Sequence, residues 1–304
     1  MLKITIVIAT YNAEKTLKQA LDSIRYQTYK NVECIVVDGG STDRTIEIVK
    51  EYDDVVTKWI SEKDNGIYDA FNKGINLATG DYICFLGSDD CYCDYEVMKS
   101  VASYLSNKTD VLSAPVKLVN EIDGKEKFLT NKYKREDILS GQMIPHQGLF
   151  VKLDVMKSYY FNKNNKIISD YEFVFRYIMD GKHIKFIDDC VVYYSNGGLS
   201  SVEFGSKNYM RVFYEEILLL HRMDVSDEQM QALFERFLRL ENNDSIKYHI
   251  KNIRRIITKR IWLVRIVREY FEKLKTYFPS KKKHRCNLRC CRWCGRNFEG
   301  VIEK

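Results

Sequence analysis

The strongest constraint on the fold is the alternation of short apolar runs with segments of helical spacing in the first 90 residues. The runs are rich in β-branched residues and cover residues 3–9, 32–37, 55–60 and 81–86. Short runs that are apolar at most positions are typical of strands buried on both faces of a parallel sheet. Helices are expected between them, most clearly at 67–78, and such alternation builds βαβ units. We therefore predict an α/β fold with a Rossmann-like, mostly parallel central sheet flanked by helices.

The pattern changes after residue 104, where strands and helices no longer alternate. We expect further strands at 111–120, 125–130, 147–151 and within 183–194, and a helix at 170–179. From residue 206 onward the apolar residues recur only at helical spacing. We therefore divide the chain into a body of residues 1–205 with halves 1–104 and 105–205, a C-terminal helical appendage of residues 206–278, and a basic tail with cysteines at residues 279–304.

Composition narrows the class of protein. Apolar residues make up 45% and charged residues 30% of the 304 residues, which is typical of globular proteins and excludes a disordered chain. No apolar run approaches the ~20 residues that a membrane-spanning helix needs. The first ten residues also lack the length and cleavage site of a signal peptide. We therefore expect a cytoplasmic protein.

The net charge of +6 hides an uneven distribution. Residues 245–304 hold 18 Lys and Arg against 4 Glu, a charge of +14, and the preceding residues carry 30 basic and 38 acidic groups, a charge of −8. Within 250–278, basic residues separate apolar ones spaced three and four apart. A basic amphipathic helix of this kind can dock on an anionic membrane surface, although it can equally pack its apolar stripe on the body.

The cysteines divide in the same way. Five lie in the body and four lie in the tail, at Cys286, Cys290, Cys291 and Cys294. An odd total without a secretion signal favours reduced thiols. The four tail cysteines lie closer together than the two ligand pairs of a zinc knuckle, so a structural zinc site is the less favoured interpretation.

Polar loops follow three of the predicted strands at their carboxyl ends. They are Thr10-Tyr11-Asn12, residues 38–43 and Ser88-Asp89-Asp90. Ligands of open parallel sheets bind beyond the carboxyl ends of the strands, so the three loops outline a cleft of nucleotide size. The alternative for Asp38 and Asp43 is a purely structural role in turns and helix caps, and Asn12 can cap the helix that follows it.

The adjacent carboxylates of Asp89 and Asp90 point to a cation. Two such groups at the end of an apolar strand repel each other unless a positive charge lies between them. Mg²⁺ or Mn²⁺ fits this site, completed by water and phosphate oxygens; the alternative is a turn rich in Asp. Neither G-x-G-x-x-G nor G-x-x-x-x-G-K-[ST] occurs, which argues against dinucleotide-linked dehydrogenases and P-loop NTPases.

Four segments taken together resemble family 2 glycosyltransferases of the GT-A fold. They are TIVIATYN at 5–12, IVVDGGSTD at 35–43, SEKDNGIYDAFNKG at 61–74, and ATGDYI at 78–83 leading to Ser88-Asp89-Asp90. The third segment is similar to a bacterial subgroup that builds O-antigen and other surface polysaccharides. The resemblance covers about residues 3–200 and makes 1–104 the nucleotide-sugar half and 105–205 the acceptor half.

The resemblance implies roles for the donor-side residues. Thr10, Tyr11 and Asn12 would contact the uridine of a UDP-sugar, and Asp38 would lie by the nucleoside. Asp90 would hold Mg²⁺ or Mn²⁺, with Asp89 on the ribose or the metal. Asp69 and Asn72 would line the donor pocket. One position departs from the pattern, because many relatives have a second aspartate where this chain has Gly39.

On the acceptor side, the resemblance places Asp170 where a carboxylate acts as the general base of an inverting transfer. Its alternative role is the N-cap of the helix at 170–179. His146, in the segment 143–148, would donate to a phosphate or ligate the metal, or else be a structural histidine. Gly197 to Ser201 resembles a flexible loop that closes the donor site.

We therefore expect an inverting glycosyltransferase that moves a sugar from a UDP-sugar to a hydroxyl of a lipid-linked glycan in surface polysaccharide synthesis, in the cytoplasm and on the inner face of the membrane. One alternative is a sugar nucleotidyltransferase, which needs a Gly-rich, basic loop that Thr10-Tyr11-Asn12 does not supply. Another is a non-enzymatic scaffold or nucleic-acid-binding protein that uses the basic tail; nucleic acid is the less favoured partner.

Overall fold

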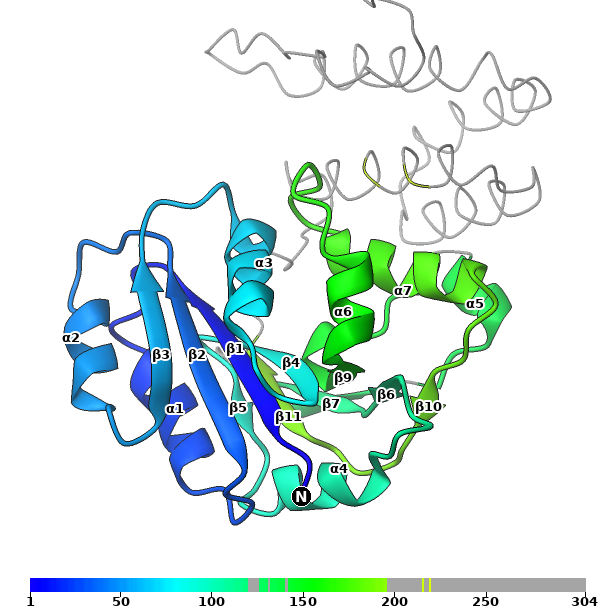
Figure 1. The fold of residues 1–304 in the computed structure, drawn as a ribbon, viewed down its shortest axis with the longest axis horizontal. Helices are drawn as coiled ribbons and strands as arrows, with labels where there is room; N and C mark the ends of the chain where they lie inside the picture. The colour runs from blue at the N-terminus through cyan, green and yellow to red at the C-terminus, as the bar shows by residue number, and fades with distance from the viewer. Residues whose placement is uncertain (120–125, 131, 140–141, 196–214, 216–218, 220–304) are drawn as a thin grey trace, which may run out of the picture. The chain divides into compact units, whose positions relative to one another are not determined.

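The computed structural model describes residues 1–119, 126–130, 132–139 and 142–195, together with Glu215 and Leu219 (Figure 1). The chain divides into two units, Met1–Asn242 and Asn243–Lys304, and all the described residues belong to the first. Apart from the helical residues Glu215 and Leu219, the predicted appendage and the predicted tail lie outside the described residues, as does the loop expected at 197–201. The boundaries after residues 205 and 278 remain predictions.

A seven-stranded sheet forms the centre of the fold, with strand order β10-β6-β9-β4-β1-β2-β3. The four strands that come first along the chain are β1 (Ile4–Thr10), β2 (Val32–Asp38), β3 (Val56–Ser61) and β4 (Tyr82–Gly87). β1 pairs in parallel with both neighbours, and the register sets Thr10 beside Asp38 and Ala9 beside Gly87. The polar loops that follow these strands therefore begin at one edge of the sheet. The predicted α/β class and the mostly parallel sheet are confirmed.

Helices cover both faces of this sheet, as Figure 1 shows. On one face lie α1 (Leu17–Arg25), α2 (Thr45–Glu51) and α4 (Val97–Tyr104), and their apolar residues share a core with Ile4, Ile6 and Ile8 of β1. On the other face α3 (Ile67–Leu77) runs along β1 and β2. This contact depends on Gly74, because a Cβ there would lie 2.3 Å from Cγ1 of Val7.

The second half of the body adds short strands and helices. They are β6 (Val111–Ser113), β7 (Val116–Val119), β8 (Glu126–Leu129), α5 (Arg135–Leu139), the 3₁₀ helix η1 (His146–Gly148), β9 (Leu149–Lys152), α6 (Leu153–Tyr159), α7 (Ser169–Met179), β10 (Lys185–Phe186) and β11 (Val192–Ser195). β9 runs antiparallel to β4 and β6. Its first residue therefore lies at the edge where β4 ends, and η1 reaches the same edge.

The prediction of a single strand at 111–120 is wrong, because two strands lie there. Ala114-Pro115 separates β6 from β7, because proline has no N–H to donate to a ladder. The two strands join different sheets, and β7 belongs to a four-stranded sheet of order β5-β11-β7-β8. Its edge strand β5 (Cys91–Tyr92) directly follows Asp90, so the second sheet holds the end of the carboxylate motif.

None of the helices in the described part of the chain is both long enough and apolar enough to cross a membrane.

Candidate active site

Asp38 organises the first two loops. Its carboxylate is fully buried and accepts hydrogen bonds from Thr10 Oγ1 at 3.1 Å, Ser61 Oγ at 2.6 Å, and the backbone N–H groups of Gly40 at 3.0 Å and Ser41 at 2.9 Å. Burial alone would raise the pKa of Asp38, but a hydrogen bond from the Ser41 hydroxyl, together with those just named, holds it below its ordinary value. Asp38 is therefore ionised and fixes the conformation of residues 38–41.

Asn12 joins the first loop to the second. Its N–H donates to Ser41 Oγ at 2.8 Å, and its Oδ1 accepts from the Thr42 N–H at 2.9 Å. The backbone at Asn12 has a φ of 50°, a left-handed conformation that asparagine tolerates better than most residues. The expectation that Asn12 caps the next helix is wrong, because α1 begins at Leu17 with Thr16 as its N-cap. Tyr11 beside it is 64% exposed.

A carboxylate lies beside Gly39, although the residue there is not an aspartate. A Cβ at Gly39 would lie 2.6 Å from Oδ2 of Asp64, which comes from the loop between β3 and α3, and 3.5 Å from the ring of Tyr11. The other oxygen of Asp64 accepts the Gly66 N–H at 2.8 Å. Sequence reasoning missed Asp64. Its only signal was the glycine at position 39, which leaves room for a side chain from elsewhere.

Asp89 and Asp90 converge at the end of β4. A Cβ at Gly87 would lie 2.6 Å from Oδ2 of Asp90 and 2.8 Å from Oδ1 of Asp89. Asp90 is only 2% exposed and accepts hydrogen bonds from the N–H groups of Gly87 at 3.2 Å and Ser195 at 3.1 Å. Burial and the negative charge of Asp89 raise the pKa of Asp90 to about 6. The two carboxylates are thus held close together, and one of them is buried.

The donor set fits a divalent cation. Among the described residues no group of three or more His, Cys, Asp and Glu side chains could hold a metal ion. Mg²⁺, however, is usually bound by one or two carboxylates together with water and substrate phosphates. The two convergent carboxylates of Asp89 and Asp90 satisfy that requirement, and their repulsion supplies the electrostatic reason for a cation to bind there.

Asp170, His146 and Tyr68 form a second polar cluster. Nδ1 of His146 lies 2.9 Å from Oδ2 of Asp170, and the hydroxyl of Tyr68 lies 2.9 Å from Oδ1. The Tyr171 N–H also donates to Oδ1, at 2.9 Å. These residues come from α7, η1 and α3, which lie far apart in the chain. The fold therefore assembles the cluster from three separate elements.

The two members of the His146–Asp170 pair stabilise each other's charge. Burial would raise the pKa of Asp170, but the hydrogen bond and charge of His146 and the Tyr68 hydroxyl hold it below its ordinary value. Burial would lower the pKa of His146, but Asp170, with a further effect of the Asp90 charge, raises it. The charge of Asp90 reaches His146, so the second cluster adjoins the carboxylate pair.

Asp170 is not a helix cap. The helix begins at Ser169, Ile168 is its N-cap, and Asp170 lies in the first turn. A carboxylate offers about four lone-pair positions, and the hydrogen bonds found among the described residues use three of them. An ionised carboxylate held in this way can accept a proton through Oδ2.

Two other predicted donor residues make contacts with neighbouring loops. Asn72 holds the backbone of Phe161 with both ends of its amide, at 2.8 and 3.0 Å. Asp69 forms an ion pair with Lys163 at 3.3 Å and accepts the Asn65 N–H at 3.2 Å. Their predicted place in the donor pocket remains a prediction, and these contacts show that both side chains shape the surrounding backbone.

Glu215 is another residue that sequence reasoning missed. It is 5% exposed, and its carboxylate accepts the N–H groups of Lys166 at 2.8 Å, Ile167 at 3.0 Å and Ile168 at 3.3 Å. These are the residues that lead into α7 and Asp170. Nothing local in the sequence links a glutamate in the predicted appendage to this loop.

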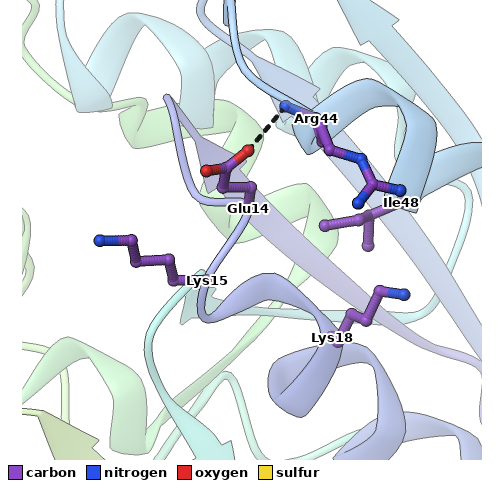
Figure 2. A pocket seen from close by; sticks show the side chains of 5 residues that line it. All are labelled: Glu14, Lys15, Lys18, Arg44 and Ile48. Carbon is purple, nitrogen blue, oxygen red and sulfur yellow. Dashed lines mark hydrogen bonds between the residues drawn. The ribbon is translucent and has the colours of Figure 1, made fainter.

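A separate pocket of about 210 Å³ lies where α1 and α2 begin. Figure 2 shows its lining by Glu14, Lys15, Lys18, Arg44 and Ile48, with the carboxylate of Glu14 accepting the Arg44 N–H at 3.1 Å. No predicted donor or catalytic residue lines this pocket. It is therefore distinct from the clusters around Asp90 and Asp170.

The fold is that of glycosyltransferases of the GT-A type, as two solved structures show. Residues 1–349 of S. aureus TarS, in complex with UDP-GlcNAc, are 22% identical with a TM-score of 0.61, over 78% of this chain and 72% of that fragment. The mannosyltransferase PcManGT from Pyrobaculum calidifontis, in complex with GDP-Man and Mn²⁺, is 15% identical with a TM-score of 0.52, over 92% of this chain and 88% of that protein.

The family model for glycosyl transferase family 2 matches residues 5–171, more than half of the chain. The chain therefore belongs to glycosyl transferase family 2, and the predicted resemblance is confirmed.

Curated relatives agree with this assignment. Glycosyltransferase GlyA of Streptococcus pneumoniae is 43% identical over 90 residues, which are 29% of this chain and 13% of GlyA. The minor teichoic acid biosynthesis protein GgaB of Bacillus subtilis is 28% identical over 205 residues, which are 62% of this chain and 22% of GgaB. The aligned segments span less than a quarter of the length of these two relatives.

Proposed function

We propose that this family 2 glycosyltransferase transfers a sugar from a UDP-sugar to a glycan hydroxyl, with inversion at the anomeric carbon. The observation that carries the proposal is the proximity of two carboxylate sites whose pKa values are shifted in opposite directions. Burial and the Asp89 charge raise the pKa of Asp90, whereas His146 and Tyr68 hold the pKa of Asp170 below its ordinary value. Both Asp90 and Asp170 raise the pKa of the His146 imidazole. One group suits a diphosphate with its metal, and the other suits a hydroxyl that must lose a proton.

Donor binding is assigned to the loops at the carboxyl ends of β1, β2 and β4. The exposed ring of Tyr11 and the carboxylate of Asp64 lie together beside Gly39. A ring offers a face for stacking, and a carboxylate accepts the imide N–H of uracil. The UDP-GlcNAc complex of TarS supports a UDP-sugar as donor.

Asp89 and Asp90 would hold Mg²⁺ or Mn²⁺, which supplies positive charge against the leaving diphosphate. A Mn²⁺ complex of PcManGT supports a divalent ion at such a site. The Ser195 and Gly87 N–H groups orient Asp90, and Nδ1 of His146 donates to the Asp170 carboxylate.

Proton removal from the acceptor is assigned to Asp170. Oδ2 takes the proton of the attacking hydroxyl, while the Tyr68 hydroxyl and the Tyr171 N–H hold Oδ1 in place. Because the carboxylate acts as a base and forms no bond to the sugar, a single displacement inverts the anomeric carbon. The name of the relative GgaB, a minor teichoic acid biosynthesis protein, and the resemblance to O-antigen enzymes support a surface polysaccharide as acceptor. We extend this proposal to a lipid-linked glycan at the cytoplasmic face of the membrane.

The test is a donor screen with the full-length protein and Mn²⁺, in which release of the nucleoside diphosphate from UDP- and GDP-sugars is measured. We expect UDP release from at least one UDP-sugar, a loss of about 10²- to 10⁴-fold in Asp170→Asn, and an unchanged rate in Asp180→Asn. Asp180 is a matched control because it is exposed and follows the last turn of the same helix. Equal rates in the two variants would contradict the role of Asp170, and release from GDP-sugars alone would contradict the UDP assignment.

A further inference from the structure

Cys93 and Cys190 form a close pair of free thiols beside the Asp90 motif. Their Sγ atoms are 3.5 Å apart although the residues are 97 positions apart in the chain. The pairing of the strands fixes this proximity. Antiparallel pairing of β5 with β11 sets Tyr92 beside Val192, and the Cys93 N–H donates to the Val191 carbonyl at 3.0 Å.

The two thiols differ in reactivity. The hydrogen bond from Cys93 lowers the pKa of Cys190 to about 7, and the nearby charge of Lys117 and the Val192 N–H act in the same direction against the effect of burial. The pKa of Cys93 is raised by that same hydrogen bond and by burial. Cys190 is therefore the more acidic thiol of the pair, and it remains partly exposed.

The other three described cysteines lack this arrangement. Cys34 and Cys84 are buried in the central sheet, and burial raises the pKa of each to about 12. Cys91 is partly exposed, but burial raises its pKa as well. Reactive cysteines lie in partly exposed surroundings with positive charge nearby, which among these five describes Cys93 and Cys190, both near Lys117.

We propose that Cys93 and Cys190 are a redox-active dithiol that exchanges with low-molecular-weight disulfides. The Cys190 thiolate attacks a disulfide RSSR, forms a Cys190–S–S–R bond and releases RS⁻. Cys93 then loses its proton, attacks Sγ of Cys190 and releases the second RS⁻. The net reaction converts two protein thiols and one RSSR into one protein disulfide and two RSH, and a reducing thiol reverses it.

The position of the pair gives the modification a consequence for the active site. The disulfide would link the segment after β5 to the segment before β11. At the opposite end of the same pair of strands, the N–H of Ser195 donates to Asp90. Oxidation would therefore fix the strand pair that orients this carboxylate. The chemistry of the pair does not depend on the proposed donor or acceptor.

The test treats the reduced full-length protein with glutathione disulfide at pH 8 without oxygen, followed by alkylation and peptide mass mapping. We expect a peptide cross-linked through Cys93 and Cys190, with Cys91 recovered in alkylated form, and loss of the cross-link after dithiothreitol. Mapping at the peptide level separates this product from the four cysteines at 286–294. Absence of the cross-link in the wild-type protein would overturn the proposal.

Single substitutions distinguish the attacking thiol from the resolving thiol. Cys93→Ser should accumulate a glutathione adduct on Cys190, because no thiol remains to resolve it, whereas Cys190→Ser should leave Cys93 unmodified. Cys91→Ser is the matched control and should form the Cys93–Cys190 cross-link at the wild-type rate. A glutathione adduct on Cys93 in Cys190→Ser, or no adduct on Cys190 in Cys93→Ser, would overturn the assignment of the attacking thiol. The wild-type cross-link decides the proposal even if a variant fails to fold.

Discussion

At the scale of single residues, the environment of Asp170 explains how an aspartate in a helix turn becomes a candidate base. Three donors hold it, and two of them come from elements that lie remote in the chain. The hydroxyl of Tyr68 is shared between Asp170 and the Ile167 carbonyl at 2.5 Å. Burial and the charge of Asp170 raise the pKa of Tyr68 well above its ordinary value. Tyr68 therefore remains a donor at all physiological pH values and acts as a positioning residue.

Tyr68→Phe should lower kcat by about tenfold or more, because a hydrogen bond to a charged group contributes about 1.5–3 kcal/mol. The loss of this donor should also raise the pKa of Asp170, so the acidic limb of the pH profile of kcat should move to higher pH. Tyr159→Phe is the matched control, since it removes a tyrosine–aspartate hydrogen bond to Asp180 at the far end of α7. A pH profile identical to that of Tyr159→Phe would argue against the positioning role.

Glu33 is a buried charge that the sequence pattern did not single out. It is 1% exposed and accepts hydrogen bonds from Thr5, Thr79 and Lys58, and these outweigh the opposing effect of burial to lower its pKa to about 2. A carboxyl whose pKa is lowered on folding stabilises the protein above its unfolded pKa, near 4.5. That stabilisation is lost as the pH falls from about 4.5 to about 2.

Glu33→Gln should therefore reduce the free energy of unfolding by about 3 kcal/mol at pH 7. The difference from the wild type should shrink at pH 3. Urea denaturation at the two pH values measures it, with Glu51→Gln as the control, because Glu51 forms an exposed ion pair with Lys18. A difference that is the same at both pH values would mean that Glu33 does not titrate as described.

At the scale of elements, the strands and their polar loops could be predicted because the signals are local. Residues 3–9 and 81–86 carry their strand pattern in the sequence itself, and the loops after them follow from the register of a parallel sheet. The contacts that complete the site are not local. Tyr68 meets Asp170 across 102 residues, and Asp64 reaches Gly39 from another loop. No periodicity encodes such pairs, because tertiary packing creates them.

The loop before α7 is also held by a residue that is remote in the sequence, Glu215. Glu215→Ala should destabilise the protein by about 2 kcal/mol, because it leaves three backbone N–H groups without their acceptor. It should also reduce kcat, since this loop leads into Asp170. Glu47→Ala, which removes an exposed pair with Arg44, is the control. Thermal melts and steady-state kinetics measure both effects, and a Glu215 variant that behaves like the control would show that the loop holds its shape without Glu215.

At the scale of the whole molecule, the uneven charge of the chain suggests a division of tasks. The first 244 residues carry a charge of −8 and include the site, whereas residues 245–304 carry +14 and lie outside the described residues. Each Lys or Arg near an anionic bilayer contributes about 1 kcal/mol of attraction, which salt screens. We infer that the basic segment docks the enzyme on the membrane that would hold a lipid-linked acceptor.

Deletion of residues 245–304 should abolish sedimentation with anionic liposomes and leave UDP binding intact. High salt should weaken the sedimentation of the full-length protein, and neutral liposomes are the control. If the apolar stripe instead packs on the body, the deleted protein will melt at a lower temperature and the full-length protein will ignore the liposomes.

The central claim is that the Asp89–Asp90 pair holds a divalent cation that binds the donor diphosphate. Isothermal titration with UDP in the presence of Mn²⁺ tests it most directly, because it does not depend on the acceptor or the sugar. We predict binding in the wild type that EDTA abolishes, no measurable binding in Asp90→Asn, and wild-type affinity in Asp94→Asn, an exposed aspartate four residues away. Equal affinity for UDP in the wild type, in the wild type with EDTA and in Asp90→Asn would contradict the claim.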